Sequence, residues 1–421
     1  MKRSSKLREA VLAYLFLLPS IVILGMFVFW PVGFSFVLSF FKWDFRNMKN
    51  PYFTGFNNYV EIFRFDYPPK YSFIFTVLNT FFHLAVASAI VLLILNFIRK
   101  KKSVVSVLAN FLIIFVYVML NVFDLENPIL SFFVASVSWS WLLYDLKKTK
   151  VKNSWAWFIL FLLVFVLVEL HSSLPGVVNF LLDAKDKNLF LKALTNTLYY
   201  VVLSVPSQIF ISLVIALLLN SNVKLRVFFR TAYFIPFVTS VVAISLVWKW
   251  IFNDEFGLLN YILSFFNVEP ISWLKDERWT IPTIAIVSVW KTVGYDAVIF
   301  LAGLQNIDRS YYEAAEVDGA NSFQKFFYIT WPLLSPTTFF LLIVSLIGAF
   351  KVFAEVYILY DGLPGPYNNS GMTLVYYVFD LFYRQQRMGI ASAAAYILFA
   401  IILIFTFVQY RFGRRAVEYV S

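Results

Sequence analysis

The sequence is poor in the residues that build metal sites and covalent crosslinks. It contains no cysteine and only two histidines, His83 and His171. The absence of cysteine excludes a disulfide framework, thiolate chemistry and metal sites built on cysteine. Two histidines are too few for a histidine-rich metal site, and we expect each of them to face a neighbouring helix or an interface rather than a ligand.

Charged residues are scarce as well. Asp, Glu, Lys and Arg make up 14% of the chain, whereas soluble domains contain roughly a quarter. Hydrophobic residues reach 61%, and 50 of the 421 residues are Phe. This composition predicts an all-α polytopic membrane protein, a bundle of transmembrane helices. No alternating pattern of about ten residues indicates a barrel.

The formal net charge of +11 raises the question of nucleic-acid binding. The basic residues, however, occur in short clusters at the ends of apolar runs and not on one polar face. The positive-inside rule produces that pattern in membrane proteins. We therefore expect a lipid bilayer, and no nucleic acid, as a partner.

Apolar runs predict about ten transmembrane spans. Four basic residues precede the first span, which is too long for a signal peptide and lacks a small-residue cleavage site, so we expect it to be uncleaved. Its flanking charges and the even span count place both termini in the cytoplasm. The predicted spans are 11–41, 73–98, 104–123, 129–146, 155–171, 193–219, 230–252, 280–304, 336–360 and 389–411.

Residues 308–336 form a long polar segment with helical character between two apolar spans, and we call this segment the 308–336 loop. Ser310 and Glu313 have the spacing of a capping box, so a helix can start there with its first amides satisfied. Ala314 and Ala315 are small, which lets another surface approach that helix face closely. The segment therefore has the shape of a docking element.

The second half of the 308–336 loop predicts a bend followed by another short helix. Gly319 can adopt a left-handed conformation at little cost, and Pro332 and Pro336 limit the length of the second helix. We expect that helix to carry one apolar side, formed by Phe323, Phe326, Phe327 and Ile329. The predicted arrangement is two helices joined at a glycine on the cytoplasmic side.

The same segment resembles the EAA loop of ABC importer permeases. Glu313-Ala314-Ala315 is followed at the family's spacing by Gly319, Ile329 and Pro332, although Trp331 replaces the usual Leu. Asp318, Gly319 and Ala320 supply the Asp-Gly-Ala common in the sugar-uptake branch. The resemblance implies that the loop docks into a cleft of a separate ATPase. The alternative is an ordinary helical loop rich in helix-forming Glu and Ala.

The resemblance covers residues 11–65 and 190–415. It implies six core spans, with residues 1–72 as an N-terminal span and outside loop, 190–415 as the permease core, and 73–172 as an inserted four-helix segment. We expect the inserted segment to be a peripheral, lipid-facing scaffold. The alternative is a docking surface for a second permease subunit or another membrane partner.

Four ionisable residues lie inside the predicted spans, where they are costly and indicate function. They are Lys291 and Asp296 in one span and Lys351 and Glu355 in the next. One interpretation is two intrahelical ion pairs, because Lys351 and Glu355 are four apart and can meet on one helix face, and Asp296 follows Lys291 by a little more than one turn. The other is a polar path for a solute. Lys249 lies near a span end, where it can extend to the interface, and we assign it no role.

The resemblance to the large membrane subunit of maltose permeases also implies positions on the solute path. Phe237 and Tyr295 would stack on a sugar ring, and Ser288 and Thr292 would bond its hydroxyls. Lys291 departs from the maltose pattern and makes a solute with an acidic group conceivable. The full predicted set is Phe237, Val241, Ser288, Lys291, Thr292, Tyr295, Gly348, Lys351, Val352 and Glu355.

These observations predict the transmembrane subunit of an ABC importer for a sugar, in the inner membrane of a prokaryote. The chain contains no G-x-x-x-x-G-K-[S/T] loop, so we expect ATP and Mg²⁺ to bind a partner ATPase dimer and no cofactor to bind here. A second permease subunit and an extracytoplasmic solute-binding protein are the other expected partners. We expect no enzyme activity. Alternatives are a permease for a non-sugar solute and an ion-coupled secondary carrier.

Overall fold

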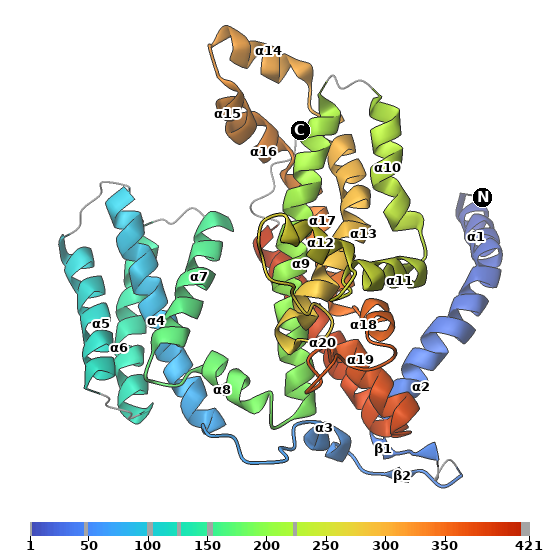
Figure 1. Cartoon of the computed structure of the whole chain (residues 1–421), viewed down its shortest axis with the longest axis horizontal. Coiled ribbons are helices and arrows are strands. Elements are labelled where there is room, and N and C mark those ends of the chain that lie inside the picture. The colour runs from blue at the N-terminus through green and yellow to red at the C-terminus, as the bar shows by residue number, and fades with distance from the viewer. Residues whose placement is uncertain are drawn as a thin grey trace. The chain divides into compact units, whose positions relative to one another are not determined.

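The computed structural model describes residues 2–45, 49–98, 104–123, 128–149, 155–221 and 225–413 (Figure 1). Parts of the predicted segments that fall in the gaps between these ranges, or after 413, lie outside the described residues. The chain divides into two compact units. The first comprises Met1–Arg64 with Leu374–Leu403, and the second comprises Phe65–Thr373 with Ile404–Ser421. Helices dominate both units, as predicted.

The first unit contains the N-terminal apolar helix and a small polar cap. Two short strands pair antiparallel, with Phe41 opposite Phe53. Gly389 lies so close to this hairpin that a Cβ would come within 2.1 Å of the Phe41 carbonyl oxygen. The elements are α1 (Lys2–Leu24), η1 (Gly25–Phe29), α2 (Trp30–Leu38), β1 (Phe41–Lys42), β2 (Tyr52–Phe53), α3 (Asn57–Ile62), α19 (Leu374–Phe379), η4 (Asp380–Arg384) and α20 (Met388–Gly413), which continues into the second unit.

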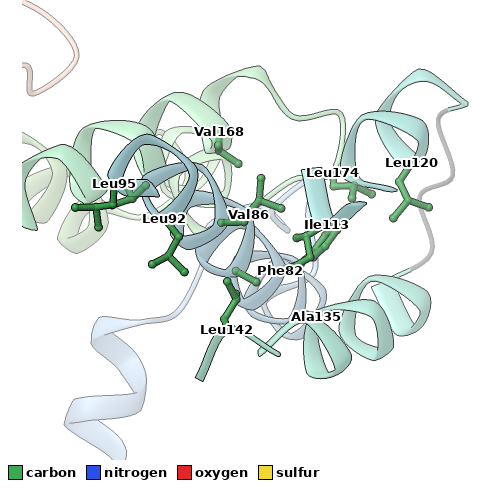
Figure 2. Packing of buried hydrophobic residues seen from close by; sticks show 13 residues of the cluster. Phe82, Val86, Leu92, Leu95, Ile113, Leu120, Ala135, Leu142, Val168 and Leu174 are labelled. Carbon is green, nitrogen blue, oxygen red and sulfur yellow. The ribbon is translucent and has the colours of Figure 1, made fainter. Parts of the chain in front are cut away.

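The residues predicted as an insertion form four helices and a short fifth helix that follows them. Their side chains bury a common apolar cluster that includes Phe82, Leu92 and Leu142 (Figure 2). The helices are α4 (Phe73–Ile98), α5 (Val104–Val122), α6 (Pro128–Thr149), α7 (Trp155–His171) and α8 (Val177–Ala184). The segment therefore has a hydrophobic core of its own.

A buried polar network ties two helices of this segment together. His83 of α4 faces Glu169 of α7, with His83 Nδ1 2.9 Å from Glu169 Oε1, and both side chains are fully buried. Ser172 lies 3.0 Å from His83 Nε2. His171, by contrast, is exposed. Since buried polar groups need hydrogen-bond partners, these contacts satisfy both ring nitrogens of His83 within the helix bundle.

The rest of the second unit carries the region that resembles a permease core. Its elements are α9 (Leu189–Asn220), α10 (Arg226–Val238), α11 (Val241–Ile251), α12 (Leu258–Ser264), α13 (Glu277–Gln305), α14 (Arg309–Val317), α15 (Ser322–Lys325), η3 (Phe326–Thr330), α16 (Trp331–Leu333), α17 (Ser335–Phe350) and α18 (Ala354–Leu359). The long helices α9 and α13 pack along each other at its centre (Figure 1).

The described residues contain six helices that are long and apolar enough to cross a membrane, or up to eight if each of two bent pairs is one span. The predicted count of ten is therefore not confirmed. The apolar parts of α6 and α7 that the structure describes, Ile129–Asp145 and Leu160–His171, are shorter than a full span. The all-helical, multi-span architecture itself agrees with the prediction.

Two predicted spans differ from continuous helices. The span predicted at 230–252 is broken after α10, and α11 continues at an angle of 100° to it. The span predicted at 336–360 ends as α17 at Phe350 and resumes as α18 at Ala354. Both runs are apolar enough overall to be predicted as single spans, although polar residues stand at the breaks: Thr239 and Ser240 in the first, and Lys351 in the second.

Gly294 sets the distance between α10 and α13. A Cβ at this position would lie 1.6 Å from the backbone oxygen of Tyr233. Only a residue without a side chain permits that approach, because the obstacle is backbone and cannot rotate away. Gly294 therefore brings the broken span against the helix that carries the predicted solute-path residues.

We predict that Gly294→Ala destabilises the protein by ~1–3 kcal/mol, the usual cost of overpacking. The amount of monodisperse protein extracted in mild detergent, and its melting temperature, measure the effect. Gly33→Ala in α2 is the matched control, because a Cβ there meets nothing within 4 Å. Normal extraction and melting of Gly294→Ala would contradict the described packing.

Candidate functional site

A cavity of about 260 Å³ lies within the second unit, among α9, α13, α17, α18 and the end of α10. Its lining mixes apolar, hydroxyl and charged side chains. Eight of the ten residues predicted for the solute path line it: Phe237, Ser288, Thr292, Tyr295, Gly348, Lys351, Val352 and Glu355. Val241 and Lys291 do not line it.

Helix geometry explains why α13 contributes several lining residues. Ser288, Thr292 and Tyr295 are spaced i, i+4 and i+7, so they share one face of α13. Ser288 is only 7% exposed, and its hydroxyl has no hydrogen-bond partner among the described residues. A buried hydroxyl without a partner is costly, so Ser288 stays a predicted contact for a group that enters the cavity.

The break between α17 and α18 brings three more side chains to the cavity. Lys351 and Phe353 have non-helical backbone angles at this point. The carbonyl of Val352, which lacks a helical partner, accepts a hydrogen bond from Thr373 Oγ1 at 2.9 Å. Because its backbone is satisfied in this way, the break can persist inside the membrane region. Lys351, Val352 and Glu355 consequently reach the cavity.

The two aromatic residues predicted to stack on a sugar stack on each other. The rings of Phe237 and Tyr295 are 4.4 Å apart between centroids and inclined by 15°. Both residues line the cavity, and the pair forms one side of it. In this conformation one face of each ring is covered by the other ring.

Lys291 is turned toward the end of α10 and not toward the cavity. Its Nζ lies 3.5 Å from the backbone oxygen of Phe237 and 5.5 Å from the centre of that residue's ring. The last carbonyls of a helix carry partial negative charge, so an ammonium group is favourable there. Lys291 therefore stabilises the end of α10 at the break.

The two predicted intrahelical ion pairs are not formed. No described contact within 4 Å joins Lys291 to Asp296 or Lys351 to Glu355, and that interpretation is wrong. Asp296 instead accepts a hydrogen bond from Gln208 Nε2 at 2.5 Å. Lys351 and Glu355 fail to meet because the helix is interrupted between them. Lys249 pairs with Asp361 at 2.5 Å.

The structure adds residues from α9 that the sequence reasoning missed. Tyr200 and Gln208 line the cavity from this helix, and the buried Ser204 lies on the same face between them. Gln208 Nε2 also approaches Ser345 Oγ of α17 at 3.3 Å. A signal was available, because three polar residues spaced four apart in an apolar helix mark one polar face.

The first helix of the 308–336 loop is capped two residues earlier than predicted. Asp308, and not Ser310, caps α14, accepting a hydrogen bond from the Ser310 backbone N–H at 2.9 Å. This bond holds the pKa of the Asp308 carboxyl below its usual range. Glu313 lies 3.4 Å from Arg309 Nε and closes no capping box. Aspartate is a favoured capping residue, and Asp308 caps α14 in place of Ser310, which lies two residues later.

The turn after α14 depends on Gly319, as predicted. Gly319 has φ +77°, and the Ala320 N–H donates to the Ala315 oxygen at 2.8 Å, which closes the helix end. A capping box that the sequence reasoning missed, formed by Asn321 and Gln324, then starts α15. The two halves of the loop are thus joined by a defined left-handed turn.

Two side-chain contacts hold the halves of the loop together. Lys325 Nζ lies 2.7 Å from Glu316 Oε1, and this bond lowers the pKa of the Glu316 carboxyl. The hydroxyls of Tyr312 and Thr330 are 2.9 Å apart. The loop is therefore a braced pair of helices and not an extended segment.

The second half of the loop contains a π-helical turn, η3, that shifts the predicted apolar side. Phe323 and Phe327 are exposed, whereas Phe326 and Ile329 are half-buried, so the four residues do not share one side. The helix ends at Leu333, after Pro332 in the first turn of α16, and α17 departs at 62° with Pro336 in its first turn. The two prolines act as predicted.

Most of the residues predicted for ATPase coupling are accessible. Glu313, Ala314, Asp318 and Gly319 are exposed, while Ala315, Ile329 and Pro332 are half-buried. Large apolar side chains surround them: Val317 is 89%, Phe323 78% and Tyr328 80% exposed. An exposed apolar group on a braced helix pair is typical of a docking surface.

The family model described as "Binding-protein-dependent transport system inner membrane component" matches residues 180–418. The chain belongs to this family. It is therefore a component of a transporter in a prokaryotic inner membrane, and its relatives are permeases and not enzymes. The match contains both the cavity and the 308–336 loop.

Relatives and a solved structure agree with this assignment. The chain is 37% identical over 223 residues to an arabinooligosaccharide permease of Halalkalibacterium halodurans, covering 52% of this chain and 70% of that one. It is 39% identical over 230 residues to a lactose permease of Rhizobium radiobacter, and this match covers 53% of this chain and 76% of that one. A bacterial alginate ABC transporter, solved in complex with an alginate-bound periplasmic protein, shares the fold with a TM-score of 0.51 and 24% sequence identity. The match covers 68% of this chain and 98% of that one.

We predict that Gly348→Leu blocks transport while the protein still folds. Gly348 lines the cavity, and a Cβ there meets nothing within 4 Å, so a leucine side chain has room only in the cavity. Uptake should fall about tenfold or more, because overfilling a packed site costs ~1–3 kcal/mol. Gly348→Ala, which adds one carbon, is the matched control and should retain most uptake. Wild-type uptake by a normally extracted Gly348→Leu would show that the solute does not use this cavity.

Proposed function

We propose that this chain is a membrane subunit of an ABC importer that moves a sugar, delivered by a solute-binding protein, into the cytoplasm. The family match over residues 180–418 carries the proposal. Relatives named as arabinooligosaccharide and lactose permeases support the sugar part of it. The solute would pass through the cavity of the second unit.

The chemistry of the cavity fits a sugar. Sugars present many hydroxyl groups and apolar ring faces, and sites for them combine hydrogen-bonding side chains with aromatic rings. The cavity offers the unpartnered Ser288 hydroxyl, the Tyr295 and Phe237 rings, and the polar face of α9. Entry of a sugar would separate the stacked rings, so that one of them can pack on the sugar.

The 308–336 loop would receive the force that drives transport. We infer that its exposed surface around Ala314 docks on one subunit of a separate ATPase dimer, which binds ATP and Mg²⁺. In the chain, α13 runs directly into α14, and α17 follows α16. Helices α13 and α17 also line the cavity. A displacement of the loop would therefore move two walls of the cavity together.

The mechanism that follows is alternating access. Closure of the ATPase dimer on ATP would pull the 308–336 loop, and α13 and α17 would rock the cavity between outward-open and inward-open forms. The broken helices α10 and α17–α18 provide places where the walls can change direction without unfolding a span. We infer from the charges near the N-terminus and from an even number of spans that both ends lie in the cytoplasm, which would put the loop on the ATPase side.

The remaining subunits complete the transport path. We propose a second permease subunit as partner, giving a heterodimer. An extracytoplasmic solute-binding protein would deliver the sugar. Transport that followed a proton or sodium gradient, without any ATPase, would instead favour a secondary carrier.

We also propose that residues 73–172 are an insertion into a permease core. The chain leaves and returns at neighbouring points: the Asp66 N–H donates to the Lys187 oxygen at 3.0 Å, and the Lys70 N–H to Asp183 Oδ2 at 2.7 Å. The family match begins at residue 180, after this segment. A segment whose ends lie side by side can be added to a fold without disturbing it.

We predict that Gly319→Pro uncouples ATP hydrolysis from transport. Proline fixes φ near −65°, whereas this residue has φ +77°, so the turn of the 308–336 loop cannot form. Uptake should fall about tenfold or more, on the scale of a strained turn costing ~1–3 kcal/mol, with insertion in the membrane intact. Gly319→Asn is the matched control, because Asn tolerates positive φ and the site is open. Equal uptake by the two variants would contradict the coupling role.

We further predict that a single cysteine at Ala314 crosslinks to the ATPase. The natural chain contains no cysteine, so Ala314→Cys reacts at one place. A bifunctional thiol reagent should join it to a cysteine placed in the docking cleft of the ATPase, detected as a heavier band on a gel. Val202→Cys, exposed on α9, serves as the control and should give no such band. Failure of Ala314→Cys to crosslink in an assembled complex would remove the 308–336 loop from the interface.

A further inference from the structure

A second cavity, which we call the hairpin cavity, lies in the first unit among β1, β2, α3 and the start of α20 (Figure 1). Its lining includes Lys42, Asp44, Tyr52, Asn57 and Arg387, and it shares no residue with the cavity of the second unit. Its volume is about 290 Å³, near the lower end of the roughly 300–1,000 Å³ typical of ligand pockets. The hairpin cavity therefore fits one small molecule.

Backbone and side-chain bonds between distant segments hold the walls of the hairpin cavity. The Gly389 N–H donates to the Trp43 oxygen at 3.1 Å, which joins the start of α20 to the residue after β1. The amide of Asn58, which is 4% exposed, donates to the backbone oxygens of Ser39 and Phe41 at 2.8 and 2.9 Å. The walls are thus fixed without help from a ligand, as is usual for binding sites.

The charged side chains of the hairpin cavity have both signs. Arg387 and Glu61 form an ion pair with each other, and both line the cavity. Lys42 lies over the Tyr52 ring, with its Nζ 5.6 Å from the ring centre. The Asp44 carboxylate has no hydrogen bond or ion pair to the described residues. A lining with two cations and two anions favours a ligand without net charge.

The remaining polar groups of the hairpin cavity offer both donors and acceptors. The Asn57 side chain can donate and accept, and it has no hydrogen bond to the described residues. The indole N–H of Trp43 is a buried donor without a partner. A hydroxyl group can donate to a carboxylate and accept from an ammonium or an N–H group. Sugars carry many hydroxyls, and their apolar ring faces pack on aromatic rings such as that of Tyr52.

We propose that the hairpin cavity binds one unit of an uncharged sugar on the extracytoplasmic side of the membrane. Asp44 and Asn57 would bond its hydroxyls, and Tyr52 would pack on its ring. The proposal rests on the proposed function for the side of the membrane, because β1 follows the first span, whose N-terminus we place in the cytoplasm. It adds a sugar contact outside the cavity through which the solute would pass.

The test uses the complete transporter in right-side-out vesicles. The natural chain contains no cysteine, so Asn57→Cys places a single thiol of this chain in the hairpin cavity. Val60→Cys is the matched control, because Val60 is 67% exposed on the same helix, α3, and does not line the cavity. A membrane-impermeant maleimide is added outside, and labelling of this chain is followed on a gel. The probes are lactose, arabinotriose and, as a zwitterion, glycine.

Lactose or arabinotriose should slow labelling of Asn57→Cys about tenfold at a concentration about ten times its Kd. Labelling of Val60→Cys should not change. Adding Asp44→Asn to Asn57→Cys should remove most of the protection, because a hydrogen bond to a charged acceptor is lost. Adding Asp183→Asn instead should preserve the protection, because this carboxylate pairs with Lys187 and does not line the cavity.

Four results would overturn the proposal: equal protection of the two cysteines, no protection by either sugar up to ~100 mM, where even a millimolar Kd gives saturation, protection that survives Asp44→Asn, or no labelling of Asn57→Cys from outside. Protection by glycine as strong as that by the sugars would show a site for zwitterions and overturn the sugar class. Sugar uptake by the cysteine-free transporter, with its binding protein and ATP, is measured separately. Only its absence would count against the proposed function.

Discussion

A backbone polar group inside a bilayer must find a partner within the protein, and this constraint governs where the chain can stop being helical. In the described core, α10 gives way to α11 around Thr239, and α17 gives way to α18 around Val352. Both breaks satisfy part of their exposed backbone: Lys291 approaches the Phe237 oxygen, and Thr373 donates to the Val352 oxygen. Both breaks also border the cavity. The two breaks in these spans thus lie beside the cavity through which we propose that the solute passes.

The second organising feature is the continuity between the cavity and the 308–336 loop. Ser288 and Tyr295 lie on the helix that enters the loop, and Gly348 lies on the helix that leaves it. Lys325 braces the loop against Glu316, and Gly319 closes its turn. An exposed docking surface and a polar cavity are therefore the two ends of the same pair of helices.

Much of this arrangement could be predicted from sequence. Long apolar runs located α4, α9 and α13, because twenty apolar residues have few alternatives to a membrane span. The turn at Gly319 was predictable from the glycine between two helical patterns. The family pattern also located six of the fourteen residues that line the cavity, and three of these, Ser288, Thr292 and Tyr295, share one face of α13.

The rest depended on contacts that no local pattern contains. A few polar residues, Thr239 and Ser240 at one break and Lys351 at the other, do not by themselves end an apolar helix. The expected helical pair of Lys351 and Glu355 therefore followed from an uninterrupted helix that does not exist. Lys291 lies in the right span but is captured by a carbonyl of α10. Gln208 joined the site only because α9 packs against α13, which is tertiary information.

The most direct test of the central claim is the ATPase activity of the complex that forms around this chain. The chain would be co-expressed with its neighbouring transport genes and purified in detergent. ATP hydrolysis would then be measured with and without the solute-binding protein, empty or loaded with sugar. The account predicts a complex that contains an ATPase and is stimulated by the sugar-loaded binding protein. A chain that purifies without any ATPase, yet moves sugar in vesicles under a proton or sodium gradient, would contradict it.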